Sequence, residues 1–326
     1  MPEPNPSPQV LCAGILVADI FVPPMPSLPA SGELRATEDF LLETGGCAAN
    51  VATSLTRLGV SAAVSGVVGT DVFGDFLINE LTEKGADTSG IRRTPYFGTS
   101  KTVVLPVIGD DRRFIHTFGA NNDFNEKDIA LDTLEEGSVL YLGGLLIMPA
   151  LKSEGVARLF EAARSRRITT VLDVVVPIGD ASEAMEYLRP ILRHTDLFMP
   201  NDEEAHSLTG EEEVEKQADA FLKAGCTTII ITQGVKGTLL KNKEVALYAD
   251  TYPIEFVDGS GSGDAFAAGY ITGLVEGWDL KRTLTFASAI GASACTQLGC
   301  TPGVFNREQA QTMMSEYLLN IPERTN

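Results

Sequence analysis

The sequence predicts an α/β fold: a doubly wound, mostly parallel sheet flanked by helices, with a small β-sheet as a lid. Short β-branched runs alternate with longer segments that carry apolar residues at helical spacing, which is typical of parallel strands joined by crossover helices. Residues 228–232 form a continuous β-branched run, as expected of a strand buried on both faces. A chain of 326 residues with 44% apolar content is sufficient for one large core.

The β-branched runs locate the expected strands, and the segments with helical spacing locate the expected helices. We expect strands over residues 10–17, 62–68, 139–142, 169–174, 197–199 and 228–232. We expect helices over residues 48–58, 73–84, 154–166, 181–188 and 213–224, followed by a helical last third with segments 263–274, 280–296 and 308–318. Several of these helices end at a glycine, which suits the left-handed backbone of a helix C-terminus.

Two stretches, 33–44 and 101–118, interrupt the alternation of strands and helices. Both alternate like exposed strands, and the second predicts a hairpin with its turn at Gly109-Asp-Asp111. Ligands of open α/β sheets bind beyond the carboxyl ends of the strands, so a small sheet made by these stretches is placed to act as a lid; an ordinary edge hairpin is the alternative. We therefore expect a single domain over 10–320, a disordered tail over 1–9 and a short tail over 321–326.

The net charge and the N-terminal sequence exclude several classes of binding partner. A formal net charge of −19 at pH 7 argues against nucleic acid or an anionic membrane as a partner, because the negative field repels both. The chain has no apolar stretch long enough to span a membrane, and its proline-rich start lacks the basic region of a secretion signal. Its five cysteines form no C-x-x-C pair, so we expect free buried thiols and a cytoplasmic protein.

A glycine-rich loop, Asp258-Gly-Ser-Gly-Ser-Gly-Asp264, leads directly into the helix expected at 263. The backbone N–H groups of Gly261, Ser262 and Gly263, together with the helix N-terminus, predict a nest for an anion such as a phosphoryl group in transfer. Asp264 lies in the first helical turn, from where it accepts a proton from an attacking hydroxyl. Taken alone, the loop is a weak signal, because Gly-Ser-Gly strings are common in flexible turns and an acidic residue in a first helical turn often only complements the helix dipole.

The loop fits neither of two common nucleotide motifs. A dinucleotide-binding glycine loop normally lies in the first strand–helix–strand unit, whereas this loop lies late in the chain and precedes only helices. The Walker pattern Gly-x-x-x-x-Gly-Lys-[Ser/Thr] is absent from the sequence.

Candidate sugar ligands lie near the N-terminus. Asp19 follows the first strand, where a carboxylate accepts hydrogen bonds from sugar hydroxyls. Gly45 and Gly46 permit close approach of a sugar to the backbone, and Asn50 either binds a hydroxyl or braces the turn. A tight turn into a helix is the alternative interpretation of the glycine pair.

The ordered combination of these motifs is far more informative than any one of them alone. Gly45-Gly46-Cys-Ala-Ala-Asn50 near the N-terminus and Asp-x-x-Gly-x-Gly-Asp ending at Asp264 resemble the ribokinase (PfkB) family of carbohydrate kinases. Further matches follow in the right order, so that the resemblance covers about residues 10–318: Gly14-Ile-Leu-Val-Ala-Asp19, Gly119-Ala-Asn121, Asn201-Asp-Glu-Glu204 and Thr232-Gln-Gly-Val-Lys-Gly237. The resemblance implies an ATP-dependent transfer of phosphate to a hydroxyl of a small sugar, with Asp264 as the base.

The resemblance also implies roles for residues that composition alone does not single out. It places Asn121 with the sugar ligands, and Asn201, Thr232, Gly234, Gly237 and Ser288 along ATP. It implies Mg²⁺ held through water by Glu204, and a monovalent cation such as K⁺ held by Asp258 and Ser260. An exposed lid edge is expected to be covered by a second subunit, which predicts a homodimer.

The sequence departs from the family on the sugar side. Cys47 replaces a lysine, Val17 replaces an asparagine, and the strand Tyr141–Leu146 lacks the acidic sugar ligand that ribokinases carry. A site that loses such partners loses discrimination, so ribose itself is not carried over. The alternatives are a nucleoside kinase, which the apolar Val17 and Leu145 favour, a fructokinase-like hexose kinase, and a catalytically silent sugar-binding regulatory protein.

Overall fold

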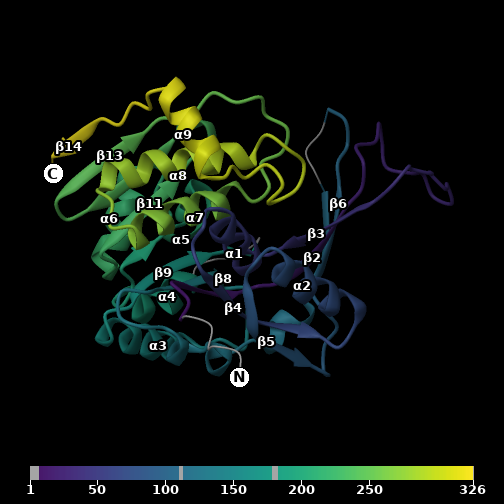
Figure 1. The fold of residues 1–326 in the computed structure, drawn as a ribbon, viewed down its shortest axis with the longest axis horizontal. Coiled ribbons are helices and arrows are strands. Elements are labelled where there is room, and N and C mark those ends of the chain that lie inside the picture. Colours follow the sequence, from purple (N-terminus) through teal and green to yellow (C-terminus); the bar gives the residue numbers. More distant parts are fainter. Residues whose placement is uncertain (1–6, 110–112, 178–182, 326) are drawn as a thin grey trace.

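The computed structural model describes residues 7–109, 113–177 and 183–325. A large sheet of ten strands forms the centre, and a separate sheet of four strands stands off one side (Figure 1). From one edge to the other, the large sheet consists of β14 (Glu323–Thr325), β13 (Val245–Ala249), β12 (Thr238–Asn242), β11 (Thr228–Thr232), β10 (Leu197–Phe198), β9 (Thr169–Val174), β8 (Val139–Leu145), β1 (Val10–Gly14), β4 (Ala62–Gly69) and β5 (Asp87–Thr94). The strands from β11 to β5 run parallel, whereas β12, β13 and β14 are antiparallel.

Two groups of helices flank this sheet. One contains α1 (Cys47–Arg57), α7 (Ser262–Val275), α8 (Leu280–Ala294) and α9 (Arg307–Glu316), and α7 packs against both α1 and α8. The other contains α3 (Ser153–Ser165), α4 (Ala184–Leu192), α5 (Asp202–Thr209) and α6 (Val214–Ala224); α2 (Val72–Glu83) packs beside β4 and β5. The predicted fold class is confirmed.

The first predicted strand, 10–17, is in fact two strands that belong to different sheets. The chain leaves the large sheet at Gly14, whose φ is +142° and where a Cβ would lie 2.1 Å from the carbonyl oxygen of Gly143. It then enters the small sheet as β2 (Val17–Phe21). Because no side chain fits at Gly14, the bend depends on glycine.

The small sheet pairs its strands in the order β3, β2, β6, β7. Of the stretch expected at 33–44, only β3 (Leu41–Gly45) pairs, whereas residues 101–118 form the expected hairpin of β6 (Lys101–Leu105) and β7 (Arg113–Thr117). The turn residues Asp110 and Asp111 lie outside the described residues, as do residues 1–6 of the expected tail and 181–182 of the expected fourth helix. Residues 7–9 and 323–325, expected in tails, instead contact the sheet, the latter as β14.

The strand register assigns each lid residue to a face. Glu43, Asp19, Thr102 and His116 lie opposite one another on successive strands and so share one face, which we call the cleft row. Leu42, Ile20, Val103 and Ile115 form a parallel outer row on the other face. Asp19 fixes the direction, since its Oδ2 lies 3.9 Å from Sγ of Cys300 in the main domain.

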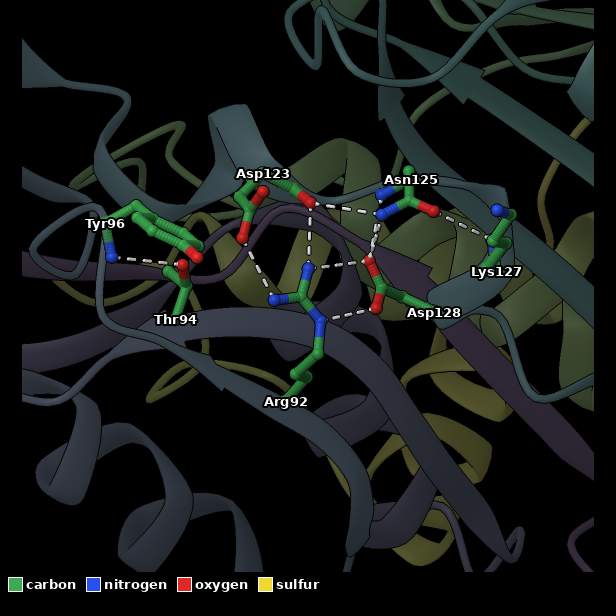
Figure 2. Close-up of polar contacts among 7 residues, drawn as sticks. All are labelled: Arg92, Thr94, Tyr96, Asp123, Asn125, Lys127 and Asp128. Carbon is green, nitrogen blue, oxygen red and sulfur yellow. Dashed lines mark hydrogen bonds and ion pairs between the residues drawn. The ribbon is translucent and has the colours of Figure 1, made fainter.

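The segment that leaves the lid is tied to edge strand β5 by Arg92. Its guanidinium donates to both carboxylate oxygens of Asp128 and to the carboxylate and carbonyl of Asp123 (Figure 2). Asn125 lies between these acids and caps the short helix that contains Asp128. Forked contacts of this kind orient a segment more strongly than a single ion pair does.

Arg92→Lys keeps the charge but removes the fork, so we expect it to lower the free energy of unfolding by about 1 kcal/mol, a modest value because the side chain is 38% exposed. Urea denaturation measures the change. Arg93→Lys is the matched control, since the Arg93–Asp75 pair is exposed and should contribute less. Equal midpoints for the Arg92 variant and wild type would contradict a stabilising role.

Candidate active site

The N-termini of α1 and α7 bring Asn50 and Asp264 together. Asn50 Nδ2 donates a hydrogen bond of 2.8 Å to Asp264 Oδ2, across more than two hundred residues of sequence. The N-terminal motif and the glycine loop, far apart in the sequence, therefore meet at this hydrogen bond. Oδ1 of Asn50 is buried and has no hydrogen-bond partner within the described residues, which leaves it available to a donor on a ligand.

The glycine loop combines one crowded position with one open position. Gly261 caps α7 with φ +71°, and a Cβ there would lie 2.4 Å from the carbonyl oxygen of Cys300. At Gly263, by contrast, no described atom lies within 4 Å of where a Cβ would stand. The N–H groups of a first helical turn have no partner inside the helix. The Ser262 N–H donates a long hydrogen bond of 3.4 Å to the carbonyl of Gly259, whereas that of Gly263 adjoins the open space, which suits an anion.

The surroundings of Asp264 act on its pKa in opposite directions. Burial raises its pKa above the ordinary aspartate value, whereas hydrogen bonds from Asn50 and Cys47 lower it. Its place in the first turn of α7 also favours the carboxylate. Asp264 is therefore a partly buried acceptor whose proton affinity exceeds that of a solvent-exposed aspartate, as a general base requires.

Asp19 is 8% exposed, and its position explains both glycines of the N-terminal motif. A Cβ on Gly45 would lie 1.9 Å from Asp19 Oδ2, and a Cβ on Gly46 would lie 2.5 Å from the carbonyl oxygen of Ile15. Both glycines thus make room for the protein's own Asp19 and Ile15, and the close approach of a sugar stays a prediction. Burial raises the pKa of Asp19 to about 6, with a hydrogen bond from Thr102 lowering it and the charge of Asp264 raising it.

Asn121, expected among the sugar ligands, is placed differently. It is 1% exposed, its Oδ1 accepts from the N–H of Leu16 at 3.1 Å, and its Nδ2 donates to the carbonyl of Leu16 at 3.0 Å. These contacts brace the link between β1 and β2. Its observed role is to hold that link, through which Asp19 is positioned.

Three residues of the site escaped the sequence prediction: Tyr141, Asp173 and, as a participant, Cys47. The Cys47 thiol and the carboxylates of Asp173 and Asp264 lie within 4.8 Å of one another. Tyr141 Oη donates to Asp173 Oδ2 at 2.9 Å. The signal was an acidic residue near the carboxyl end of the predicted strand 169–174, which is where open α/β sheets carry functional groups.

A cavity of about 460 Å³ adjoins the open side of Gly263. Its walls include the predicted residues Thr232, Gly234, Gly237, Ser262, Gly263 and Ser288, with apolar side chains such as Val235, Ile254 and Phe266. Ser288 Oγ is buried without a described partner. An apolar cavity with a few polar groups and a helix N-terminus at one end fits a flat aromatic base joined to phosphates.

Asn201 and Glu204 lie beside this cavity and form a capping box for α5. Asn201 Oδ1 accepts from the Glu204 N–H at 2.8 Å, and Glu204 Oε2 accepts from the Asn201 N–H at 2.9 Å. An isolated bridge joins Asn201 to Thr232, which links the motif to the cavity wall. Burial raises the pKa of Glu204 to about 7, against backbone hydrogen bonds from Asn201 and Val176 that lower it.

Asp258 and Ser260 lie on the far side of the glycine loop. Asp258 is 3% exposed, and its carboxylate accepts from the N–H and Oγ of Ser260, each at 3.1 Å, and from the N–H of Gly299 at 3.1 Å. These contacts anchor the loop that presents Gly261 and Gly263. Asp258 is therefore a structural support of the anion nest.

The family of the chain follows from comparison with known proteins. Residues 7–306 match the family model described as pfkB family carbohydrate kinase. The chain belongs to this family. A probable fructokinase-5 of Arabidopsis thaliana is 26% identical and covers 94% of this chain and 98% of its own length, and a ribokinase of Haemophilus influenzae is 24% identical with coverages of 87% and 92%.

Solved structures of the pfkB family share the fold. Ribokinase from Thermotoga maritima superposes with a TM-score of 0.78 at 24% identity and covers 94% of this chain and 99% of its own. Ribokinase of Arabidopsis thaliana, solved with ribose and ATP, gives a TM-score of 0.78 at 22% identity with the same coverage. None of the helices in the described part of the chain has the length and apolar character needed to cross a membrane.

Proposed function

We propose that this carbohydrate kinase transfers the γ-phosphoryl group of ATP to a hydroxyl of a small sugar, with Asp264 as general base. The position of Asp264 supports this proposal most strongly. Its carboxylate contacts Asn50 beside the lid, and the helical turn that contains it adjoins the cavity at Gly263. Asp264 therefore lies between the proposed sugar site and the proposed ATP site.

The acceptor oxygen forms a bond to the γ-phosphorus, the bond between that phosphorus and the β,γ-bridging oxygen breaks, and ADP leaves with the bonding electrons. The acceptor's hydroxyl proton goes to Asp264. N–H groups at Gly261, Ser262 and Gly263 stabilise the charge on the phosphoryl oxygens, and Asp19 and Asn50 orient the acceptor.

ATP is proposed to lie in the 460 Å³ cavity, with its base near the unpartnered Ser288 hydroxyl and its phosphates toward Gly263. Asn201, Thr232, Gly234 and Gly237 line its path. Mg²⁺, when bound, neutralises charge on the phosphates, and Glu204 is proposed to hold it through water. A monovalent cation such as K⁺ is proposed to rest on Asp258 and Ser260 behind the loop; ATP turnover measured with K⁺ against a bulky organic cation tests it.

The raised pKa of Glu204 leads to a pH prediction. With a pKa of about 7, Glu204 is ionised above that pH and becomes protonated below it, so its hold on Mg²⁺ should weaken as the pH falls. We expect the Mg²⁺ concentration for half-maximal turnover to rise several-fold between pH 8 and pH 6. Glu204→Gln should raise this concentration and remove its pH dependence through this range, whereas Glu203→Gln is the exposed control.

The nucleoside alternative depended on Val17 and Leu145 as apolar contacts for a base. Val17 is 4% exposed and Leu145 is fully buried, so these residues offer little surface to a substrate. A small sugar therefore suits the cleft better than a nucleoside. Acceptor-dependent ADP release, measured over pentoses, hexoses, sugar acids and nucleosides, tests the function. Sugar binding without turnover would favour the silent regulatory protein instead.

A homodimer is proposed from the outer row of the lid. Leu42 and Ile115 of this apolar row are 38% and 64% exposed, and the row crosses all four strands. A second copy that covered it would bury an apolar face that water otherwise contacts. Measurement of the mass in solution tests this. A cytoplasmic location is proposed from the free cysteines, which a reducing compartment maintains.

A further inference from the structure

The acceptor half of the cleft is unusually acidic. Asp19, Asp173 and Glu204 surround Asp264. Burial raises the pKa of Asp19 and of Asp173; the charge of Asp264 raises both further, and that of Glu204 also raises the pKa of Asp173. Asp19 is 8% exposed, and Asp173, Glu204 and Asp264 are partly buried. An anion that entered this space would lose part of its hydration and would face these carboxyl groups.

Basic side chains border the lid, but Lys101 lies on the outer face with Val103. Lys101 donates to the carbonyl of Thr99 and lies 4.0 Å from Asp71. Arg57 donates to the carbonyls of Thr301, Pro302 and Val304. Lys84 donates to Thr44 Oγ1 and lies 3.6 Å from Glu80. Burial raises the pKa of Glu43 at one end of the cleft row, and the charges of Lys84 and Arg57 lower it.

The lid hairpin does not supply a cation among its described residues either. Arg113 alternates with Phe114 along β7 and so points to the outer face, together with Ile115. His116 lies on the cleft row, but burial lowers its pKa, which favours the neutral ring at pH 7. Among the described residues, no basic side chain forms a hydrogen bond or ion pair with Asp19, Asp173, Glu204 or Asp264, so the inner acceptor site offers no cation to a phosphate or carboxylate.

Asp173 is the carboxylate that no other part of the proposed reaction uses. Its Oδ1 accepts from the N–H of Val174 at 2.9 Å and its Oδ2 from Tyr141, so each oxygen keeps a further lone pair. Tyr141 reaches it because Gly143 has no side chain: a Cβ there would lie 2.5 Å from Tyr141 Oη. The carboxylate lies within 4.8 Å of that of Asp264, next to the hydroxyl that would react.

We propose that Asp173, held by Tyr141, binds a second hydroxyl of the acceptor, and that the site selects uncharged polyhydroxy compounds over sugars that carry phosphate or carboxylate. This inference rests on the proposed kinase function and narrows its substrate class. The protonated form of Asp173, favoured by burial, both donates and accepts hydrogen bonds and avoids a second charge beside the base.

The wild-type test compares matched acceptors by ADP release. Fructose and ribose are each measured against fructose 6-phosphate and ribose 5-phosphate, with gluconate as the carboxylate. We expect kcat/KM for the best uncharged sugar to exceed that of its phosphorylated counterpart by more than a hundredfold. Preference for a phosphorylated sugar would overturn the inference while leaving the kinase function intact, whereas no acceptor-dependent release at all would overturn the proposed function itself.

Variants of Asp173 distinguish a role in sugar binding from a purely structural role. Asp173→Ala removes the proposed hydrogen bond to a neutral carboxyl group, so it should raise KM for the sugar by about 3- to 10-fold while KM for ATP stays unchanged. Asp173→Asn, whose amide still donates and accepts, should raise it by less. Tyr141→Phe should move KM for the sugar in the same direction by less. Asp196→Asn, at the opposite end of the sheet, is the control. A purely structural role would change both KM values together, and this result or an unchanged sugar KM would refute the assignment.

Discussion

Asp264→Asn is expected to lower kcat by about a thousandfold, because a positioned general base contributes roughly 10²- to 10⁴-fold to proton transfer. The variant should fold, since the amide oxygen of the new side chain can still accept from Asn50 Nδ2. Burial raises the pKa of Asp264, so its carboxylate costs stability above that pKa, and removal of the charge should leave the urea midpoint at neutral pH unchanged or higher. Steady-state ADP release with the best acceptor measures kcat.

Asp75→Asn is the matched control for this variant. Asp75 also lies in the first turn of a helix, α2, and complements its dipole, but it pairs with Arg93 far from the cleft. If the loss at Asp264 reflected only a weakened helix terminus, both variants would behave alike. Wild-type kcat in the Asp264 variant would show that another group takes the proton.

The fold was predictable because its signals are local. Helices α1, α2, α3 and α6 begin and end within one residue of their expected bounds, since the apolar period and terminal glycines act over a few residues, whereas α4 spans Ala184–Leu192 instead of the expected 181–188. The bend at Gly14 was not predictable, because what demands glycine there is the carbonyl of Gly143, far along the chain. Strands β12 to β14 were missed because an antiparallel edge lacks the strong β-branched run of the central strands.

On the phosphate side, the glycine loop and the walls of the cavity were predicted. These residues are proposed to bind phosphate through backbone N–H groups at places where a side chain would block the ligand. Both features require glycine, so they are visible in the sequence itself. The sugar side was predicted less well. Gly45 and Gly46 make room for Asp19 and Ile15, Asn121 braces Leu16, and Asp173 was missed, because side-chain contacts between distant strands leave no local pattern.

Gly263→Ala should separate stability from activity. No described atom lies within 4 Å of the added Cβ, and alanine favours a helix over glycine by up to about 1 kcal/mol, so the urea midpoint should stay the same or rise. The new methyl group, however, would stand in the space proposed for the γ-phosphoryl group. We expect kcat to fall at least a hundredfold, comparable to the loss of one oxyanion donor, when ADP release is measured at saturating sugar.

Two neighbouring substitutions make this result interpretable. Ser262→Ala keeps its N–H and adds no atom toward the cavity, so its kcat should stay within a few-fold of wild type. Gly261→Ala should instead unfold at lower urea, because its φ of +71° and the carbonyl of Cys300 at 2.4 Å both oppose a side chain. A fully active Gly263→Ala enzyme would mean that the phosphoryl group does not bind at this helix terminus, even if Asp264 were the base.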